Sequence, residues 1–324
     1  MKPTRRLFCL IKWSLLIGTP CTIALMVAAW LWLRPNGLAY SGPLDDYIQE
    51  RRGSLSSVTS FAATETWRSS EIEYLELTSS SGMHFRMAVR RPLGPQPEKL
   101  PVVILIGGFD RGHRAIKLLE EDLHMVVVAL SYPYRGKTRM SGVEYLIALR
   151  ELRAGLHDTP AAILLALDYL LTLPNVDGGQ VELVGISLGS FFTIVAGAAD
   201  PRFTRIWSLQ GGADIPGLLE HTMKPKIRFR PLRACLVKLG QVLLTRLEPY
   251  QHVQHISPRP FVQINARHDV RIPQWSAEKL HASAGDPKEL IWTETGHIDA
   301  ARASIIADLS ELVLLRIERG KSAP

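Results

Sequence analysis

Residues 181–189 have the sequence VELVGISLG, and this stretch decides the fold class of the chain. An apolar run leads into the motif Gly185-Ile186-Ser187-Leu188-Gly189, and a second apolar run follows it. This order predicts a buried strand that turns sharply into a helix, with the serine at the tip of the turn. Glycines suit the flanking positions because side chains there would clash around a strained serine. The hydroxyl of Ser187 and the amide of Leu188 then face the same space, as a nucleophile beside a donor for an oxyanion.

The pentapeptide alone also fits a turn of small residues in which a serine caps a helix. The surrounding sequence favours a nucleophilic serine, because a candidate acid and a candidate histidine follow in order, each after its own predicted strand. Residues 260–265 predict a buried strand that ends shortly before Asp269, and residues 290–293 predict a last strand that is followed by His297. A histidine transfers protons near neutral pH, and a carboxylate orients it. Asp214 is the competing acid.

With Ser187, Asp269 and His297 in this order, the chain resembles the α/β-hydrolase superfamily over residues 71–317. The resemblance implies a Ser-His-Asp triad in which the serine attacks a carbonyl carbon. It therefore implies a serine hydrolase, with a carboxylic ester as the expected substrate, either a small molecule or lipid-like. The alternatives are an acyltransferase or a peptidase on the same triad, and a non-catalytic scaffold that binds a partner. No metal and no organic cofactor are expected.

The resemblance also extends to residues 105–109, LIGGF, which end a predicted strand. In the superfamily, the loop after the third strand supplies a second oxyanion amide beside that of the residue after the nucleophile. Here it implies a donor at Gly108 or Phe109, to act with the amide of Leu188. The superfamily usually has His-Gly at this place, whereas this chain has Gly107-Gly108.

Strands and helices alternate along the body of the chain, which predicts an α/β fold. The sheet is expected to be mostly parallel, with helices on both faces. An N-terminal β-hairpin is predicted from the alternation in residues 71–77 and 83–90. The further predicted elements are strand 102–107, helix 113–123, strand 125–131, helix 157–172, strand 181–186, helix 188–198 and strand 205–210.

Residues 215–257 interrupt this alternation and predict a cap insertion over the end of the sheet. Apolar residues from Leu232 to Leu247 recur at helical spacing, and seven basic residues with no acid fall within 222–246. Two interpretations stay open. The cap helix packs on the domain with its charges in solvent, or the segment docks on an anionic membrane surface.

Tyr134 and Arg135 follow the predicted strand 125–131 at the same edge of the sheet as the motif. They are candidates for lining the substrate pocket. Pro133 and Gly136, which flank them, equally favour a purely structural turn.

The front of the chain differs from its body. Residues 13–33 contain no charged residue and, as a helix, would extend ~31 Å, which is enough to cross a bilayer. This run predicts a transmembrane signal anchor at 13–33, and the basic residues before it predict a cytoplasmic flank at 1–12 by the positive-inside rule. Residues 34–70 are then expected to form a juxtamembrane linker with one short helix near 44–52. A signal peptide cleaved near Gly37-Leu38-Ala39 is the alternative.

The domain at 71–324 is thus expected outside the cytoplasm, on the periplasmic side of a single-pass bacterial protein. Only Cys235 lies in that domain, so it has no internal disulfide to form. The net charge of +7 does not indicate nucleic-acid binding, because the excess comes from residues 1–34 and 222–246.

Overall fold

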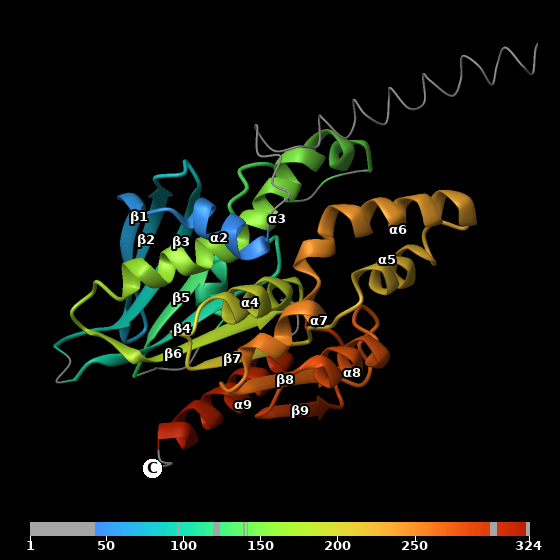
Figure 1. Cartoon of the computed structure of the whole chain (residues 1–324). Helices are drawn as coiled ribbons and strands as arrows, with labels where there is room; N and C mark the ends of the chain where they lie inside the picture. Colours follow the sequence, from blue (N-terminus) through green and yellow to red (C-terminus); the bar gives the residue numbers. More distant parts are fainter. Residues whose placement is uncertain are drawn as a thin grey trace, which may run out of the picture.

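A computed structural model describes residues 43–95, 98–118, 124–138, 140, 142–298 and 303–321. Its nine strands form one sheet in the order β1-β2-β3-β5-β4-β6-β7-β8-β9 (Figure 1). From β5 to β9 every neighbouring pair is parallel, while β1, β2, β3 and β5 pair antiparallel. The mostly parallel sheet predicted from the sequence is therefore present. The strands are β1 (Leu55–Trp67), β2 (Ser70–Ser79), β3 (His84–Pro92), β4 (Leu100–Ile106), β5 (Val126–Leu130), β6 (Val176–Ile186), β7 (Arg205–Leu209), β8 (Phe261–Ala266) and β9 (Lys288–Thr293).

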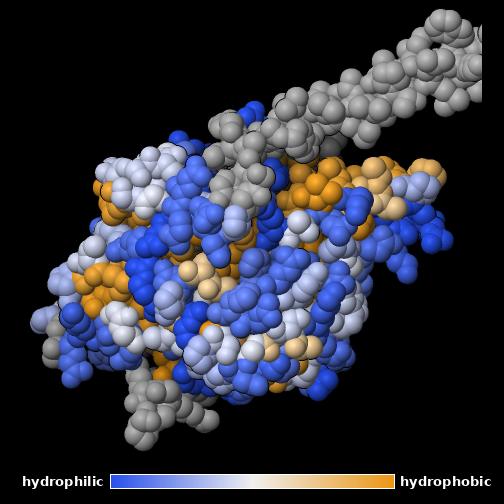
Figure 2. Space-filling view, viewed as in Figure 1, coloured by the Kyte–Doolittle hydropathy of each residue, from blue (hydrophilic) through white to orange (hydrophobic). Residues whose placement is uncertain are grey.

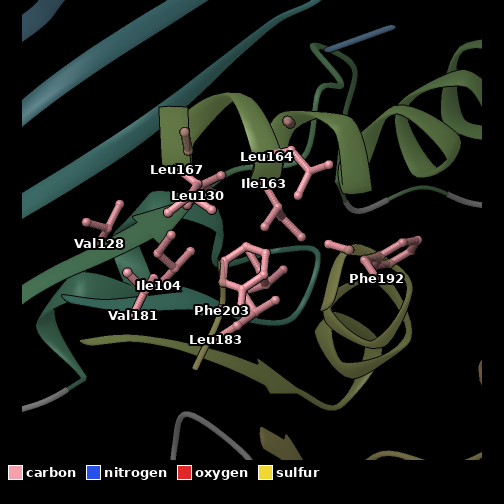
Figure 3. Packing of buried hydrophobic residues seen from close by; sticks show 14 of the residues in the cluster. Ile104, Val128, Leu130, Ile163, Leu164, Leu167, Val181, Leu183, Phe192 and Phe203 are labelled. Atoms are coloured by element: carbon pink, nitrogen blue, oxygen red, sulfur yellow. The ribbon is translucent and has the colours of Figure 1, made fainter. Parts of the chain in front are cut away.

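Helices cover both faces of this sheet, as a parallel sheet with two apolar faces requires. One face packs against α3 and α4, and the other packs against α9 (Figure 1). Figure 3 shows the first contact, in which strand residues meet apolar side chains of the helices; the labelled residues include Ile104, Val128 and Leu183 from strands and Ile163, Leu164 and Phe192 from helices. The helical elements are α2 (Leu44–Arg52), η1 (Gly112–Lys117), α3 (Gly142–Leu170), α4 (Leu188–Ala199), α5 (Ile215–Met223), α6 (Arg230–Leu244), η2 (Thr245–Leu247), α7 (Pro249–His252), η3 (Val253–Ile256), α8 (Gln274–Ser283) and α9 (Ala303–Lys321).

The predicted linker at 34–70 is wrong for its second half. The short helix near 44–52 is present as α2, but residues 55–67 form the edge strand β1, which pairs with β2 over its whole length. Most of its side chains are exposed, so the strand lacks the apolar alternation that marks a half-buried strand. Pairing with β2 supplies its backbone hydrogen bonds instead. Within the described residues, the folded domain therefore already includes α2 and β1, before residue 71.

Two predicted helices also differ in extent. The helix expected at 157–172 begins at Gly142 and ends at Leu170, with Pro160 in its interior. The helix expected at 113–123 is the short 3-10 helix η1, and residues 119–123 lie outside the described residues.

The predicted cap occupies its expected place between β7 and β8. It consists of α5, α6, η2, α7 and η3, and its first two helices form a hairpin that projects from the body (Figure 1).

The segment predicted to span a membrane, residues 13–33, lies outside the described residues, and so that prediction stays a prediction. Among the helices of the described ranges, none is both long and apolar enough to cross a bilayer.

Candidate active site

Ser187 occupies the sharp turn between β6 and α4. Its backbone has φ 53° and ψ −117°, a conformation that a residue with a side chain rarely adopts. The turn closes only because glycines flank it. A Cβ on Gly189 would overlap the carbonyl of Ile106 in the neighbouring strand, and a Cβ on Gly185 would overlap the first turn of α4. The strained geometry carries the Ser187 hydroxyl out beyond the end of the sheet.

The structure brings the three candidate triad residues into contact at this edge. The Ser187 Oγ lies 2.9 Å from Nε2 of His297, and Nδ1 of the same imidazole lies 2.6 Å from Oδ2 of Asp269. The imidazole side chain is 7% exposed and the aspartate side chain is fully buried. Serine, histidine and aspartate are thus linked in series, and both Ser187 and His297 line a cavity.

Backbone amides fix the orientation of Asp269. Its Oδ1 accepts hydrogen bonds from the amides of Arg271 (2.8 Å) and Ile272 (2.9 Å), which turns Oδ2 toward His297. The competing acid, Asp214, lies elsewhere: it accepts a hydrogen bond from the amide of Gly217 at the start of α5 and pairs with Lys279.

Gln210 holds the loop that carries His297, and the sequence analysis did not identify it. Its Nε2 donates to the carbonyl of Gly296 at 3.0 Å, and its Oε1 accepts from the amide of Ile298. The side chain is fully buried and the backbone has φ 50°. The only local signal was a polar residue at the end of a buried strand. Nothing in the sequence connected it to a loop more than eighty residues away.

Two of the candidate oxyanion donors, Leu188 and Gly108, line the two cavities that meet at Ser187. Leu188 is the first residue of α4, so its amide has no acceptor within the helix. Gly108 lines a cavity with Ser187 and His297, whereas the ring of Phe109 packs against Tyr132.

Tyr132 stabilises the loop that holds these glycines. Its hydroxyl donates a hydrogen bond of 2.8 Å to the carbonyl of Gly107. Burial, followed by the nearby Asp110 charge, raises the pKa of Tyr132, so the phenol stays protonated and remains a donor at all working pH values.

Two cavities of opposite character meet at Ser187. One, of about 270 Å³, runs beneath α5 and α6 and is lined almost entirely by apolar side chains, including Leu188, Phe191, Leu218 and Ile272. The other, of about 220 Å³, contains His297 and the loop at 107–111, with two arginines, Arg111 and Arg271, in its wall.

Tyr134 and Arg135, the predicted pocket residues, line neither of these cavities. They contribute to a separate hollow with Glu76 and His113. The ring of Tyr134 packs on Phe109 at a centroid distance of 5.4 Å, and Arg135 pairs with Glu76 at 2.7 Å. These contacts turn both side chains away from Ser187, in agreement with the structural-turn alternative.

Comparison with known proteins identifies the fold. The sequence matches no protein-family model and no curated protein. Its structure is similar to an acetyl xylan esterase from Paenibacillus sp. R4, with TM-score 0.67 and 16% identity over 88% of this chain and 96% of that chain. It is also similar to acetyl xylan esterase 1 from Thermoanaerobacterium sp. JW/SL YS485, with TM-score 0.59 and 15% identity over 85% and 93% of the two chains. An acylaminoacyl peptidase from Pyrococcus horikoshii matches with TM-score 0.56 and 18% identity over 78% of this chain and 41% of that chain. The chain therefore has an α/β-hydrolase-like fold.

Proposed function

We propose that this protein is a serine hydrolase that cleaves a carboxylic ester through an acyl-enzyme. The observation that carries the proposal is the hydrogen-bonded series from Ser187 through His297 to Asp269, with separations of 2.9 and 2.6 Å. A fold alone hosts many functions, and so the site has to support the chemistry.

In the first half-reaction, Oγ of Ser187 attacks the ester carbonyl carbon and its proton passes to Nε2 of His297. Asp269 holds the opposite ring nitrogen and stabilises the imidazolium that forms. The amide of Leu188 and that of Gly108 or Phe109 donate to the oxyanion of the tetrahedral intermediate. The bond to the alcohol oxygen then breaks, and His297 returns the proton to the departing alcohol.

Water completes the turnover. His297 takes a proton from a water molecule, whose oxygen attacks the acyl carbon, and the second tetrahedral intermediate collapses with release of the acid and of the Ser187 hydroxyl. Each proton taken by the imidazole is returned within the same half-reaction, so the enzyme ends in its starting state.

The direct test is the hydrolysis of p-nitrophenyl esters by a Ser187→Ala variant. We expect kcat to fall by roughly four orders of magnitude or more while the protein stays folded. Ser190→Ala is the matched control, because Ser190 lies one turn along and its hydroxyl donates to the carbonyl of Gly185. Loss of that single hydrogen bond should cost less than about tenfold. Near-native activity of Ser187→Ala would refute the proposal.

A further inference from the structure

We propose, on the basis of the hydrolase function above, that the acyl part of the substrate is an unbranched apolar chain of about eight to ten carbon atoms. The chain lies in the cavity beneath α5 and α6, which we call the acyl cavity. It opens onto Ser187, and side chains of α4, α5 and α6 form its walls (Phe192, Ile215, Leu218, Leu219, Met223 and Leu244).

The volume of the acyl cavity sets the length of chain. Its 270 Å³ compare with about 30 Å³ for a water molecule in the liquid, and a methylene group is of similar size. Because this volume is the space open to the centre of a water-sized group, the cavity holds at least about nine such groups. Each methylene moved from water into an apolar cavity should raise kcat/KM about fourfold, until the cavity is full.

The direction of the ester is fixed by His297. This imidazole must protonate the departing alcohol, so the alcohol lies on its side of Ser187, in the cavity with Gly108 and Arg111. That cavity is polar, whereas the acyl cavity is apolar. The structure thus favours an ester between an apolar acid and a polar alcohol over the reverse arrangement.

The test is the acyl-length profile of p-nitrophenyl esters from two to sixteen carbons, measured for the full chain and three variants. Thr222 lines the cavity from an exposed position at the end of α5, so Thr222→Trp should fill it and move the optimum to about four carbons. Met223→Ala should enlarge it and move the optimum to longer chains. Glu278→Trp adds the same ring at an exposed position of α8 that lines neither cavity, and should leave the profile unchanged.

Opposite shifts in the two cavity variants are the expected result. An optimum at two carbons, or a profile that neither variant moves, would overturn the acyl-cavity inference. The proposed function would then still stand, provided that the activity depends on Ser187. Absence of ester hydrolysis by the native chain would instead refute the proposed function. The opposite change in Met223→Ala provides a second test that does not depend on the folding of Thr222→Trp.

A different observation supports an inference about the outer surface of the cap. The hairpin of α5 and α6 exposes Phe229 (67%), which precedes α6, and Leu232 (49%) and Val242 (61%) on α6. Figure 2 shows apolar surface along α6, with hydrophilic surface at its far end. Isolated exposed apolar residues are common, but a row of them on one projecting helix is not explained by packing.

Four exposed cations surround the tip of this hairpin: Lys224, Lys226, Arg228 and Arg230. Within the described ranges, no salt bridge joins any of them to an acid, and residues 222–246 contain no acid at all. We infer that the hairpin docks on an anionic lipid surface. Its cations would approach the headgroups, and Phe229 with the exposed face of α6 would enter the boundary with the acyl chains. This inference corresponds to the second of the two interpretations of residues 215–257 given in the sequence analysis.

Cys235 provides the probe, because it is exposed on α6. A full chain with Cys9→Ser and Cys21→Ser would be labelled there with a dye that shifts to the blue in apolar surroundings, and then reconstituted into vesicles. A blue shift is expected in vesicles with 30% phosphatidylserine and not in pure phosphatidylcholine. Replacing the four cations by glutamine should abolish it. An equal shift in both lipids, or a shift that follows protein concentration as in self-association, would overturn the inference.

Discussion

Replacing Gln210 by alanine removes the one side chain that bonds to both neighbours of His297. The carbonyl of Gly296 loses its donor and the amide of Ile298 loses its acceptor. Each unsatisfied buried backbone group costs about 1–3 kcal/mol, so the loss of both bonds should destabilise the folded protein by roughly 2–6 kcal/mol unless the loop moves to meet water. Such a movement carries the imidazole away from Ser187. A displacement of 1 Å at a reacting group costs up to about 100-fold, and we expect kcat/KM to fall by that order.

The assay compares kcat/KM for a p-nitrophenyl ester with the free energy of unfolding in urea. Gln263→Ala is the matched control, because Gln263 is also a fully buried glutamine and bonds to Asn265 and Ala277 rather than to the histidine loop. It should lose comparable stability but keep activity within a few-fold. If Gln210→Ala kept kcat/KM within about threefold of native, Gln210 would not position His297.

Gln210→Glu adds a pH-dependent test of the same contact. An ionised glutamate presents two acceptors, and so it repels the carbonyl of Gly296, whereas a protonated one can still donate. Burial raises the pKa of a carboxyl group. The loss of kcat/KM in Gln210→Glu relative to the native protein should therefore shrink as the pH falls. The loss in Gln210→Ala should stay the same. Equal deficits at all pH values would mean that the hydrogen bond to Gly296 does not matter.

Three further predictions concern stability, and urea unfolding measures each of them. Burial lowers the pKa of His157 to about 4, below its value of about 6.5 in an unfolded chain. Between these pH values the unfolded chain binds the proton and the folded chain does not. The free energy of unfolding should therefore fall by up to about 3 kcal/mol as the pH drops from 6.5 to 4. His157→Gln should flatten this pH dependence, and an unchanged pH dependence in the variant would contradict the prediction. Arg51 pairs through two hydrogen bonds with Asp158, whose side chain is 7% exposed. Arg51→Met should therefore destabilise the fold by about 3 kcal/mol, and the double variant with Asp158→Asn should recover part of the loss. A double variant less stable than the single one would count against this pairing. Gly189→Ala places a Cβ against the carbonyl of Ile106 and should cost about 3 kcal/mol, whereas a neutral effect would show that the turn has room for a side chain.

The parts of the fold that sequence reasoning predicted are those with a local signal. The buried strands are continuously apolar, and the turn at Ser187 is marked by its glycines. The acid and the histidine each follow a strand, so their convergence at one edge of the sheet follows from the parallel arrangement alone. For that reason, the sequence alone predicts that these residues, far apart in the chain, lie together in the fold.

The features that escaped prediction depend on tertiary contacts. Strand β1 has mostly exposed side chains, and only its pairing with β2 makes it a strand. Gln210 acts on a loop that no pattern links to it. Tyr134 and Arg135 lie at the expected edge but turn toward Phe109 and Glu76, because side-chain direction depends on the neighbours that a folded chain supplies.

The most direct test of the central claim is covalent labelling of the full chain with a fluorophosphonate, followed by mass spectrometry of its peptides. The Ser187 hydroxyl, activated by the imidazole of His297, should attack the phosphorus atom of the probe. The adduct is predicted on Ser187 alone, and labelling should be strongly slowed in His297→Asn. An adduct on another residue, or an unlabelled chain beside a fully labelled reference serine hydrolase, would contradict the account.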